Sequence, residues 1–467
     1  MTMYFQQYYL ECLSHASYLI GDTTSGNAVV VDPQRDVSQY LADAEANGLR
    51  IVKVIETHFH ADFLSGHLGL HEQVGADIVY GRAATRRTEF PIEALANGSV
   101  IALGDPHHGV TLEILETPGH TPESICVVVR EHGDDDVPYG VLTGDTLFIG
   151  DVGRPDLLAA VGFTADELAH QLYESLHTKL LTLPDATRVY PAHGAGSACG
   201  KNLSTETVST IGEQRRLNYA LQPMSEDAFV EAVTQGQAAA PLYFLFAATK
   251  NRQAHEPLQE EQAVTPLGVD DVLAAQASGA AIVDTRDAAD FGAAHLRRSI
   301  NVGLGGRFAE YTGEVVAPGT PIVLVTEPGY EHEAKTRLAR IGFDNVVGVL
   351  DDALGTFVRR PDLVDRSSRL SATELEERRA GVADIQIVDV RGPGEVALGA
   401  IPGAAHIQLP QLVNRLGELD PAKPTVVYCA GGYRSSIAAS TLRANGFTDV
   451  SDLLGGFNAW LGRESAA

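Results

Sequence analysis

Short apolar runs that end in histidine or aspartate organise the first half of the chain. Residues Ile51 to Glu56 predict a buried strand, and a dense polar run, Thr57 to His67, follows it at once. Further strand-like runs recur at Thr111 to Glu116, Ile125 to Arg130, Tyr139 to Thr143 and Arg188 to Tyr190. Most of them lead into a potential metal ligand, namely His120, Asp145 or His193. We therefore expect several strand ends to converge on one chemistry.

The second half of the chain contains a repeat. Residues 201 to 235 have a helical pattern. The stretch Gly236 to Pro266 has neither the helical nor the strand period, and it is interpreted as a linker with a short docking segment. Beyond it, the segment IVDTRDAADFGAAHLRRSINV from Ile282 corresponds to IVDVRGPGEVALGAIPGAAHI from Ile387. Two copies of a βα unit of about 100 residues indicate tandem domains.

Composition narrows the class of protein. At ~150 residues per domain, 467 residues predict roughly three domains, and 44% apolar residues allow each a core. The start of the sequence lacks the pattern of a signal peptide, and no ~18-residue apolar run predicts a membrane span, so we expect a cytoplasmic protein. A net charge of −27 argues against a nucleic-acid partner. Four scattered cysteines are too few for a disulfide framework.

Four separated blocks carry the metal-binding signal. They are Thr57-His58-Phe59-His60-Ala61-Asp62-Phe63, Thr117-Pro118-Gly119-His120, Thr143-Gly144-Asp145 and Tyr190-Pro191-Ala192-His193. In this order they resemble the metallo-β-lactamase superfamily over about the first 235 residues. The family motif places a histidine where this chain has Phe63, and a phenyl ring cannot bind a metal. A mononuclear site with two imidazoles and one carboxylate favours Fe(II) and oxygen chemistry.

Within that superfamily, THFHADFLSGH and GDVGRPDL resemble the rhodanese-associated persulfide dioxygenases. The resemblance implies that His58, His120 and Asp145 bind one Fe(II) per chain, with Zn as the alternative metal. It places His60, Asp62 and His193 around these ligands, where hydrogen bonds orient them. His60 is also an alternative fourth ligand. Arg154 either binds an anionic persulfide or, as we prefer, pairs with Asp156.

A glycine-rich loop carries the second chemistry. The strand Thr425 to Tyr428 leads into Cys429-Ala430-Gly431-Gly432-Tyr433-Arg434-Ser435, and a helix follows at once. Backbone N–H groups and the helix N-terminus would cradle an anion and lower the pKa of the thiol, which makes Cys429 a candidate nucleophile. Phosphatases of related fold have one more residue between their cysteine and arginine.

This loop resembles the active-site loop of rhodaneses, which implies catalytic roles for Cys429 and Arg434. It also implies substrate contacts by Gly431, Gly432, Tyr433 and Ser435. The first copy has Thr326-Glu327-Pro328-Gly329-Tyr330-Glu331 at the aligned positions, so both the nucleophile and the arginine are missing. We interpret this copy as a pseudo-rhodanese with an architectural role.

The predicted fold class is a multidomain α/β and α+β protein, a metallo-β-lactamase αββα sandwich followed by two rhodanese-like α/β domains. The predicted limits are 1–240 for the dioxygenase, 241–263 for the linker, 264–362 for the pseudo-rhodanese and 368–467 for the catalytic rhodanese. We expect a homo-oligomer that uses a small thiol persulfide, O2 and sulfite or thiosulfate, with no membrane partner. Two rivals remain: a glyoxalase II-like zinc thioester hydrolase with a sulfurtransferase attached, and a non-enzymatic sulfur-binding or sensing protein.

Overall fold

Short runs of largely apolar residues build two facing sheets in residues 1–237 and 244–260, the first of two units in the chain. The computed structural model describes residues 2–157, 162–201, 203–382 and 384–464. One sheet has the strand order β1-β2-β3-β4-β5-β6, and the other has β12-β11-β10-β9-β8-β7.

The bounds of the strands in the first sheet are β1 Met3–Leu10, β2 His15–Asp22, β3 Asn27–Val31, β4 Arg50–Ile55, β5 Asp77–Gly81 and β6 Glu93–Leu95. Those of the second are β7 Val100–Ala102, β8 Thr111–Glu116, β9 Ile125–Arg130, β10 Gly140–Gly144, β11 Arg188–Pro191 and β12 Ser209–Thr210. The predicted runs at 111–116 and 125–130 are therefore strands with the expected limits.

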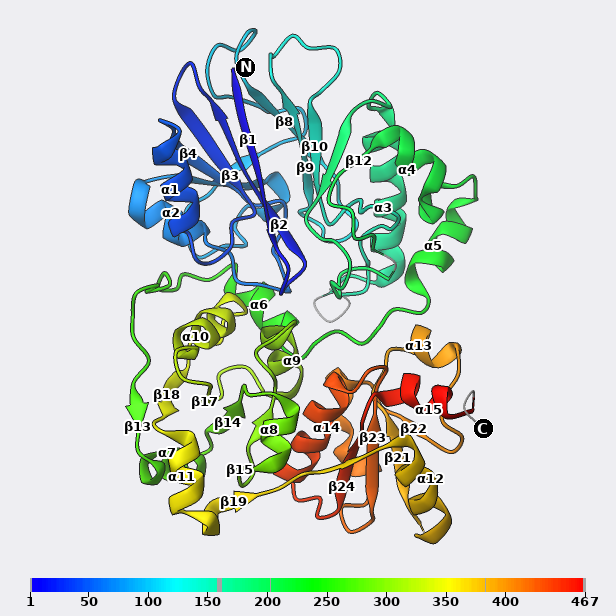
Figure 1. Cartoon of the computed structure of the whole chain (residues 1–467). Helices are drawn as coiled ribbons and strands as arrows, with labels where there is room; N and C mark the ends of the chain where they lie inside the picture. Colours follow the sequence, from blue (N-terminus) through cyan, green and yellow to red (C-terminus); the bar gives the residue numbers. More distant parts are fainter. Residues whose placement is uncertain (1, 158–161, 202, 383, 465–467) are drawn as a thin grey trace. The chain divides into compact units, whose positions relative to one another are not determined.

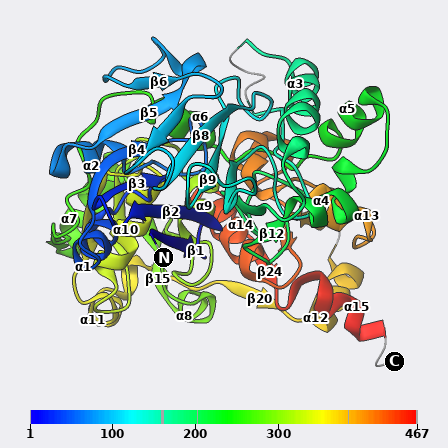
Figure 2. The same ribbon diagram turned by 90° about the horizontal axis from the view of Figure 1, so that it is seen from above.

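Helices cover the outer face of each sheet, as Figures 1 and 2 show for this unit. Helices α1 (Ser38–Ala46) and α2 (His67–Val74) flank the first sheet, and α3 (Ala165–Thr178), α4 (Ile211–Leu217) and α5 (Glu226–Thr234) flank the second. One apolar core lies between the sheets, and one lies under each helical layer. This four-layer arrangement confirms the predicted αββα sandwich.

The helical prediction for residues 201 to 235 is wrong in part. Residues 209–210 form a strand, and the remainder contains two short helices with a 3-10 turn between them. Local capping explains the break: the Asn218 side chain accepts a hydrogen bond from the Ala220 N–H, and the Ser225 side chain accepts one from the Ala228 N–H. Each cap begins a new element rather than continuing the previous helix.

The stretch predicted as a linker also docks on the first unit. Helix α6 (Phe244–Lys250) and the residues up to Glu260 belong to that unit, whereas residues 238–243 group with the second. The buried side chain of Asn251 donates hydrogen bonds to the carbonyls of His60 and Phe63, both at 2.8 Å, and accepts one from the Ser65 N–H at 2.9 Å. The docked segment thus holds the loop that contains the first metal-binding motif.

The second unit, residues 238–243 and 261–467, contains the two predicted repeats. Each has a five-stranded parallel sheet, in the orders β13-β18-β17-β14-β16 and β20-β24-β23-β21-β22. Numbered within each repeat, both orders are 1-5-4-2-3. The sequence repeat is therefore a repeat of topology.

The strands of the first repeat are β13 Pro266–Leu267, β14 Ala281–Asp284, β16 Ile300–Asn301, β17 Ile322–Val325 and β18 Val346–Leu350, with β15 His295–Leu296 paired to β19 Val364–Asp365. Its helices are α7 Val269–Ala277, α8 Ala288–Ala293, α9 Phe308–Val315, α10 Glu331–Arg340 and α11 Ala353–Arg359. The second repeat has β20 Ser368–Leu370, β21 Gln386–Asp389, β22 Ala405–His406, β23 Thr425–Tyr428 and β24 Val450–Leu453, with α12 Ala372–Gly381, α13 Pro393–Ala397, α14 Tyr433–Ala444 and α15 Gly456–Glu464.

Within the described residues, no helix has both the length and the apolar content that crossing a bilayer requires.

Candidate metal centre and cysteine loop

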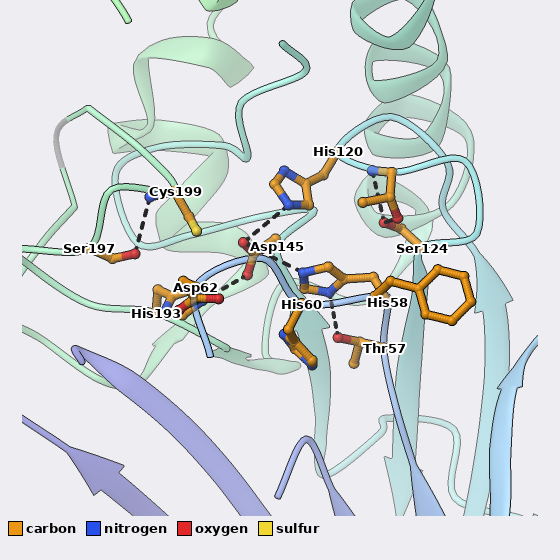
Figure 3. A network of polar contacts seen from close by, with 12 residues as sticks. Thr57, His58, His60, Asp62, His120, Ser124, Asp145, His193, Ser197 and Cys199 are labelled. Carbon is orange, nitrogen blue, oxygen red and sulfur yellow. Dashed lines mark hydrogen bonds and ion pairs between the residues drawn. The ribbon is translucent and has the colours of Figure 1, made fainter. Parts of the chain in front are cut away.

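Three buried side chains meet at the ends of strands in the first unit. His58 follows β4, His120 lies between β8 and β9, and Asp145 follows β10. Their ligand atoms all lie within 4.8 Å of one another, and Figure 3 shows the side chains pointing together. The Asp145 Oδ2 atom is 3.4 Å from His120 Nε2 and 3.9 Å from His58 Nε2. The structure thus brings together the three residues predicted as ligands.

The orientation of His58 comes from a chain of hydrogen bonds. The Thr57 hydroxyl donates to Asp32 Oδ2 at 2.8 Å, and the same oxygen lies 3.0 Å from His58 Nδ1. Because that hydroxyl already donates to Asp32, it can accept the His58 Nδ1–H, which leaves Nε2 as a lone-pair donor toward Asp145. Gly144 permits this packing: its φ is +49°, and an added Cβ would lie 2.7 Å from the Thr57 hydroxyl oxygen.

His120 is oriented in the same way. Its Nδ1 lies 2.9 Å from the Arg154 carbonyl oxygen, so its Nε2 faces the Asp145 carboxylate. Both Asp145 oxygens are buried without a hydrogen-bond partner. An ionised carboxylate in that position is costly unless a cation neutralises it. Two imidazoles and one carboxylate, all with free lone pairs, are donors that fit a divalent transition metal such as iron or zinc.

Asp62 and His193 lie beside this group. His193 Nε2 is 3.3 Å from Asp62 Oδ2 and 3.4 Å from Asp145 Oδ1. Burial disfavours the charged imidazole, but the carboxylates of Asp62 and Asp145 outweigh it and raise the pKa of His193. Cys199 forms a second potential metal-binding group with Asp62 and His193. Burial raises the pKa of its thiol well above the usual value.

His60 faces carboxylates rather than the three ligand atoms. Its Nε2 lies 3.0 Å from Asp32 Oδ1 and 3.3 Å from Glu56 Oε2. Burial opposes the charged form, yet Asp32 and Glu56 raise the pKa of His60 well above its usual value. Its Nδ1 is buried without a hydrogen-bond partner. The Phe63 ring packs against His60, with centroids 4.4 Å apart, where the family motif has a further histidine.

Arg154 makes the predicted ion pair. Its guanidinium donates two hydrogen bonds to the Asp156 carboxylate, both at 2.7 Å, and a third to the Ala198 carbonyl at 3.1 Å. Because its donors are engaged in this way and its carbonyl orients His120, Arg154 shapes the loop.

The second cluster is the loop after β23. The Cys429 Sγ atom accepts a hydrogen bond from the Gly432 N–H at 3.1 Å and lies 3.6 Å from the Ser435 hydroxyl. The thiol is 1% exposed. Gly432 has a φ of +108°, which a residue with a side chain rarely adopts, and it turns its N–H toward the sulfur. Helix α14 begins at the next residue.

Arg434 has an ionic partner within its own repeat. It forms a bidentate ion pair with Glu395 of α13, with both N–O distances at 2.7 Å. Burial opposes ionisation of Glu395, but the hydrogen bonds and charge of Arg434 lower the pKa of that carboxyl. Gly431 is exposed and Ser435 is buried, so the residues predicted to contact substrate differ in accessibility.

In the first repeat, Thr326 follows β17 as Cys429 follows β23. Its hydroxyl is buried and makes no hydrogen bond. The Glu331 carboxylate accepts a hydrogen bond from the Gly329 N–H, with both oxygens at 3.0 Å. The Glu331 carboxylate therefore already uses the Gly329 N–H of this loop. Residues 326–331 contain no arginine that could take over the role of this N–H as a donor.

Comparisons with known proteins match the domains in which the two clusters lie. The profile of the metallo-beta-lactamase superfamily matches residues 10–193, and that of the rhodanese-like domain matches residues 269–358 and 371–463. The mitochondrial persulfide dioxygenase ETHE1 of Bos taurus is 32% identical over 237 residues, which cover 50% of this chain and 82% of the relative. Hydroxyacylglutathione hydrolase of Nitrosococcus oceani is 32% identical over 177 residues, which cover 38% and 61% respectively.

A solved structure matches a larger part of the chain. The crystal structure of a metallo-beta-lactamase from Staphylococcus aureus subsp. aureus COL superposes with a TM-score of 0.69 at 32% identity. The match covers 75% of this chain and 99% of the Staphylococcus protein.

Proposed function

Because the chain belongs to the metallo-β-lactamase superfamily and joins that fold to two rhodanese-like domains, we propose that it oxidises a thiol persulfide with O2 at Fe(II) and transfers sulfane sulfur at Cys429. The proposed oxidation is RSSH + O2 + H2O → RSH + SO3²⁻ + 2H⁺. The sulfane sulfur loses four electrons in this step, and O2 accepts them. The thiol RSH is a low-molecular-weight thiol.

The proposed ligands are His58, His120 and Asp145. Fe(II) held by them would supply the oxygen-activating chemistry, with positions left open for substrate. The chain's own residues orient the donors: Thr57 directs His58, and the Arg154 carbonyl directs His120. Asp62 and His193 lie next to Asp145, where they would fix its carboxylate and exchange protons with bound water or substrate.

The iron proposal rests on one observation: His58, His120 and Asp145 bring their ligand atoms together, and Phe63 stands beside this site. Phe63 puts a buried apolar ring beside His60 where the superfamily motif has an imidazole. A second metal would therefore depend on Asp62, His193 and Cys199. Zinc hydrolysis of a thioester is the second candidate, and the similarity to hydroxyacylglutathione hydrolase favours it.

For the sulfurtransferase half, Cys429 is the proposed nucleophile. Its persulfide would give thiosulfate by Cys–S–S⁻ + SO3²⁻ → Cys–S⁻ + S2O3²⁻. In that step the terminal sulfur moves from the cysteine to sulfite, and the S–S electron pair stays with Cys429. The Gly432 N–H donates to the sulfur and would stabilise its thiolate. Arg434, held by Glu395, would bind the anionic co-substrate at the loop.

We propose the functional limits 1–240, 264–362 and 368–467, within which all three profile matches fall. Residues 244–260 are then an accessory part of the dioxygenase, because they hold its motif loop. We also propose a cytoplasmic homo-oligomer.

The test is anaerobic purification, metal analysis and oxygen uptake on a panel of thiol persulfides. We expect about one iron per chain and oxygen uptake that a chelator abolishes and Fe(II) restores. Two tightly bound zinc ions, with hydrolysis of a glutathione thioester and no oxygen uptake, would establish the hydrolase instead.

A further inference from the structure

The first half of the catalytic loop is held within its own repeat. The Cys429 carbonyl accepts a hydrogen bond from the Phe457 N–H at 2.7 Å, and the Ala430 carbonyl accepts one from the Asn458 N–H at 3.1 Å. Both donors lie in the first turn of α15. These bonds fix the peptide groups at the nucleophile, but they do not reach Gly432 and Tyr433.

The second half of the loop is held by the inactive repeat. The Tyr433 hydroxyl donates to the Gly303 carbonyl at 2.6 Å and lies 3.0 Å from the Gly305 carbonyl. The Tyr433 ring also packs edge-on against Tyr311 of α9, with centroids 5.4 Å apart. Both contacts connect Tyr433, which lies between Gly432 and Arg434, to the repeat that lacks a nucleophile.

The receiving segment is itself fixed. The Arg337 guanidinium from α10 donates to the carbonyls of Leu304 and Gly306, on either side of Gly305. Farther along α14, the Ser436 hydroxyl donates to Asn301 Oδ1 at 2.9 Å, and the Asn301 N–H donates to the Ser440 hydroxyl at 2.9 Å. The inactive repeat therefore presents a hydrogen-bonded surface to the start of α14.

The corresponding tyrosine of the inactive repeat has no such role. Tyr330 occupies the position of Tyr433 in the loop after β17, and it is 49% exposed. Among the described residues, its hydroxyl makes no hydrogen bond. The anchoring contact is thus present for the loop with the nucleophile and not for its degenerate copy.

We propose that the inactive repeat holds the sulfurtransferase loop in its working geometry through Tyr433, which makes Tyr433 a positioning residue. The inference rests on the proposed function of Cys429. Gly432 precedes Tyr433, and its N–H points at the Cys429 sulfur. Fixing the Tyr433 hydroxyl therefore fixes the orientation of that N–H. This assigns Tyr433 a role other than the substrate contact that the rhodanese resemblance implies.

The test compares Tyr433→Phe with the matched variant Tyr330→Phe in the full chain. Each removes one hydroxyl and keeps the ring. The first measurement is the rate at which iodoacetamide alkylates Cys429 at pH 7 without any sulfur substrate. We expect it to fall at least about threefold in Tyr433→Phe, because the sulfur loses a well-aligned donor, and to stay unchanged in Tyr330→Phe.

The second measurement is kcat and KM for sulfur transfer from thiosulfate to cyanide. We expect kcat to fall about tenfold in Tyr433→Phe and KM for thiosulfate to stay within about twofold, since Glu395 holds Arg434 independently of Tyr433. Ser440→Ala weakens the same interface away from the loop and should change neither alkylation nor kcat. Tyr311→Leu removes the ring contact and should give a smaller loss in both.

Two outcomes would overturn the proposal: alkylation and kcat of Tyr433→Phe within twofold of wild type, or equal losses in Ser440→Ala, which would assign the effect to the interface as a whole. If Tyr433→Phe does not fold, Tyr311→Leu decides, and alkylation and kcat that both equal those of wild type would then overturn the proposal. A wild-type chain that transfers no sulfur, but whose Cys429 alkylation still depends on Tyr433, would refute the proposed function and leave the positioning role intact.

Discussion

At the residue scale, the proposed metal centre depends on one donor atom from each of three side chains. His58→Ala, His120→Ala or Asp145→Ala should each abolish oxygen uptake, because every one removes a donor atom from a three-residue set. His193→Ala should reduce uptake less, since its Nε2 faces Asp62 and Asp145 rather than completing that set. Iron content and oxygen uptake of the four variants are the measurement. Iron loss in His193→Ala equal to that in His120→Ala would show that the ligand assignment is wrong.

Glu314 predicts a pH-dependent contribution to stability. This side chain of α9 is buried, its Oε2 has no hydrogen-bond partner, and burial raises its pKa to about 8. The charges of Arg307 and Arg434 lower that pKa, and Glu310 raises it. Because the folded pKa exceeds the unfolded value of about 4.5, folding becomes less favourable as the pH rises from that value through 8.

Glu314→Gln should therefore remove a loss of stability that the wild type suffers at alkaline pH. We expect the difference in unfolding free energy between variant and wild type to grow in favour of the variant from pH 5 to pH 9. Urea unfolding at both pH values measures it. A difference that does not change with pH would contradict the buried, protonated state of Glu314.

Thr326 allows a test of the proposed inactivity of the first repeat. Thr326→Cys in a Cys429→Ser background should transfer no sulfur, because the Glu331 carboxylate already holds the Gly329 N–H and would repel a thiolate and its anionic substrates. In the wild type, peptide mapping after sulfur transfer should find a persulfide on Cys429. A fully active Thr326→Cys repeat would defeat the electrostatic argument.

At the element scale, the segment from α6 to Glu260 supports the metal centre from outside the sandwich. Asn251→Ala would leave two carbonyls and one N–H of the motif loop without their partner. We expect a loss of about 1–3 kcal/mol in the stability of the first unit and weaker retention of iron. Asn47→Ala, at an exposed helix end, is the control. Equal metal retention in both variants would exclude a supporting role for α6.

Five strands of the first unit could be predicted because each is a short apolar run, and most of these runs lead into a potential metal ligand. The runs 111–116 and 125–130 match β8 and β9, and Asp145 and His193 follow strands as expected. The prediction of a helix over 201–235 was wrong in part because amphipathic spacing does not reveal that Asn218 and Ser225 cap new elements. Docking of 244–260 depends on long-range hydrogen bonds that have no local pattern.

The candidate site was incompletely predictable for a similar reason. The Asp32 carboxylate accepts hydrogen bonds from the Thr57 N–H and hydroxyl. Asp32 is a buried acid directly after β3. The rule that identified Asp145, an acid after a strand, also fits Asp32. Cys199 lies in a loop that has neither helical nor strand periodicity, and only the fold brings it close to Asp62 and His193. The Glu395–Arg434 pair likewise joins residues 39 positions apart.

At the scale of the whole molecule, one chain joins a candidate metal centre to the Cys429 loop that we propose transfers sulfur. The metal-centre residues His58, His120 and Asp145 lie in the first unit and the Cys429 loop lies in the second, and among the described residues the two clusters share none. Placing both on one chain raises the local concentration of the sulfur species that they share, whatever the arrangement of the units. The account therefore predicts two activities that are coupled by substrate and separable by mutation.

The most direct test measures oxygen, sulfite and thiosulfate together in wild type, Cys429→Ser and Asp145→Ala, each supplied with a small-thiol persulfide and O2. Cys429→Ser should still consume oxygen and release sulfite, while enzyme-catalysed exchange between sulfite and thiosulfate falls by orders of magnitude, because a serine hydroxyl is a far weaker nucleophile. Asp145→Ala should transfer sulfur and take up no oxygen. If Cys429→Ser keeps its iron but stops consuming oxygen on free persulfide, Cys429 must deliver sulfur to the metal centre, and the account of two separable activities is wrong.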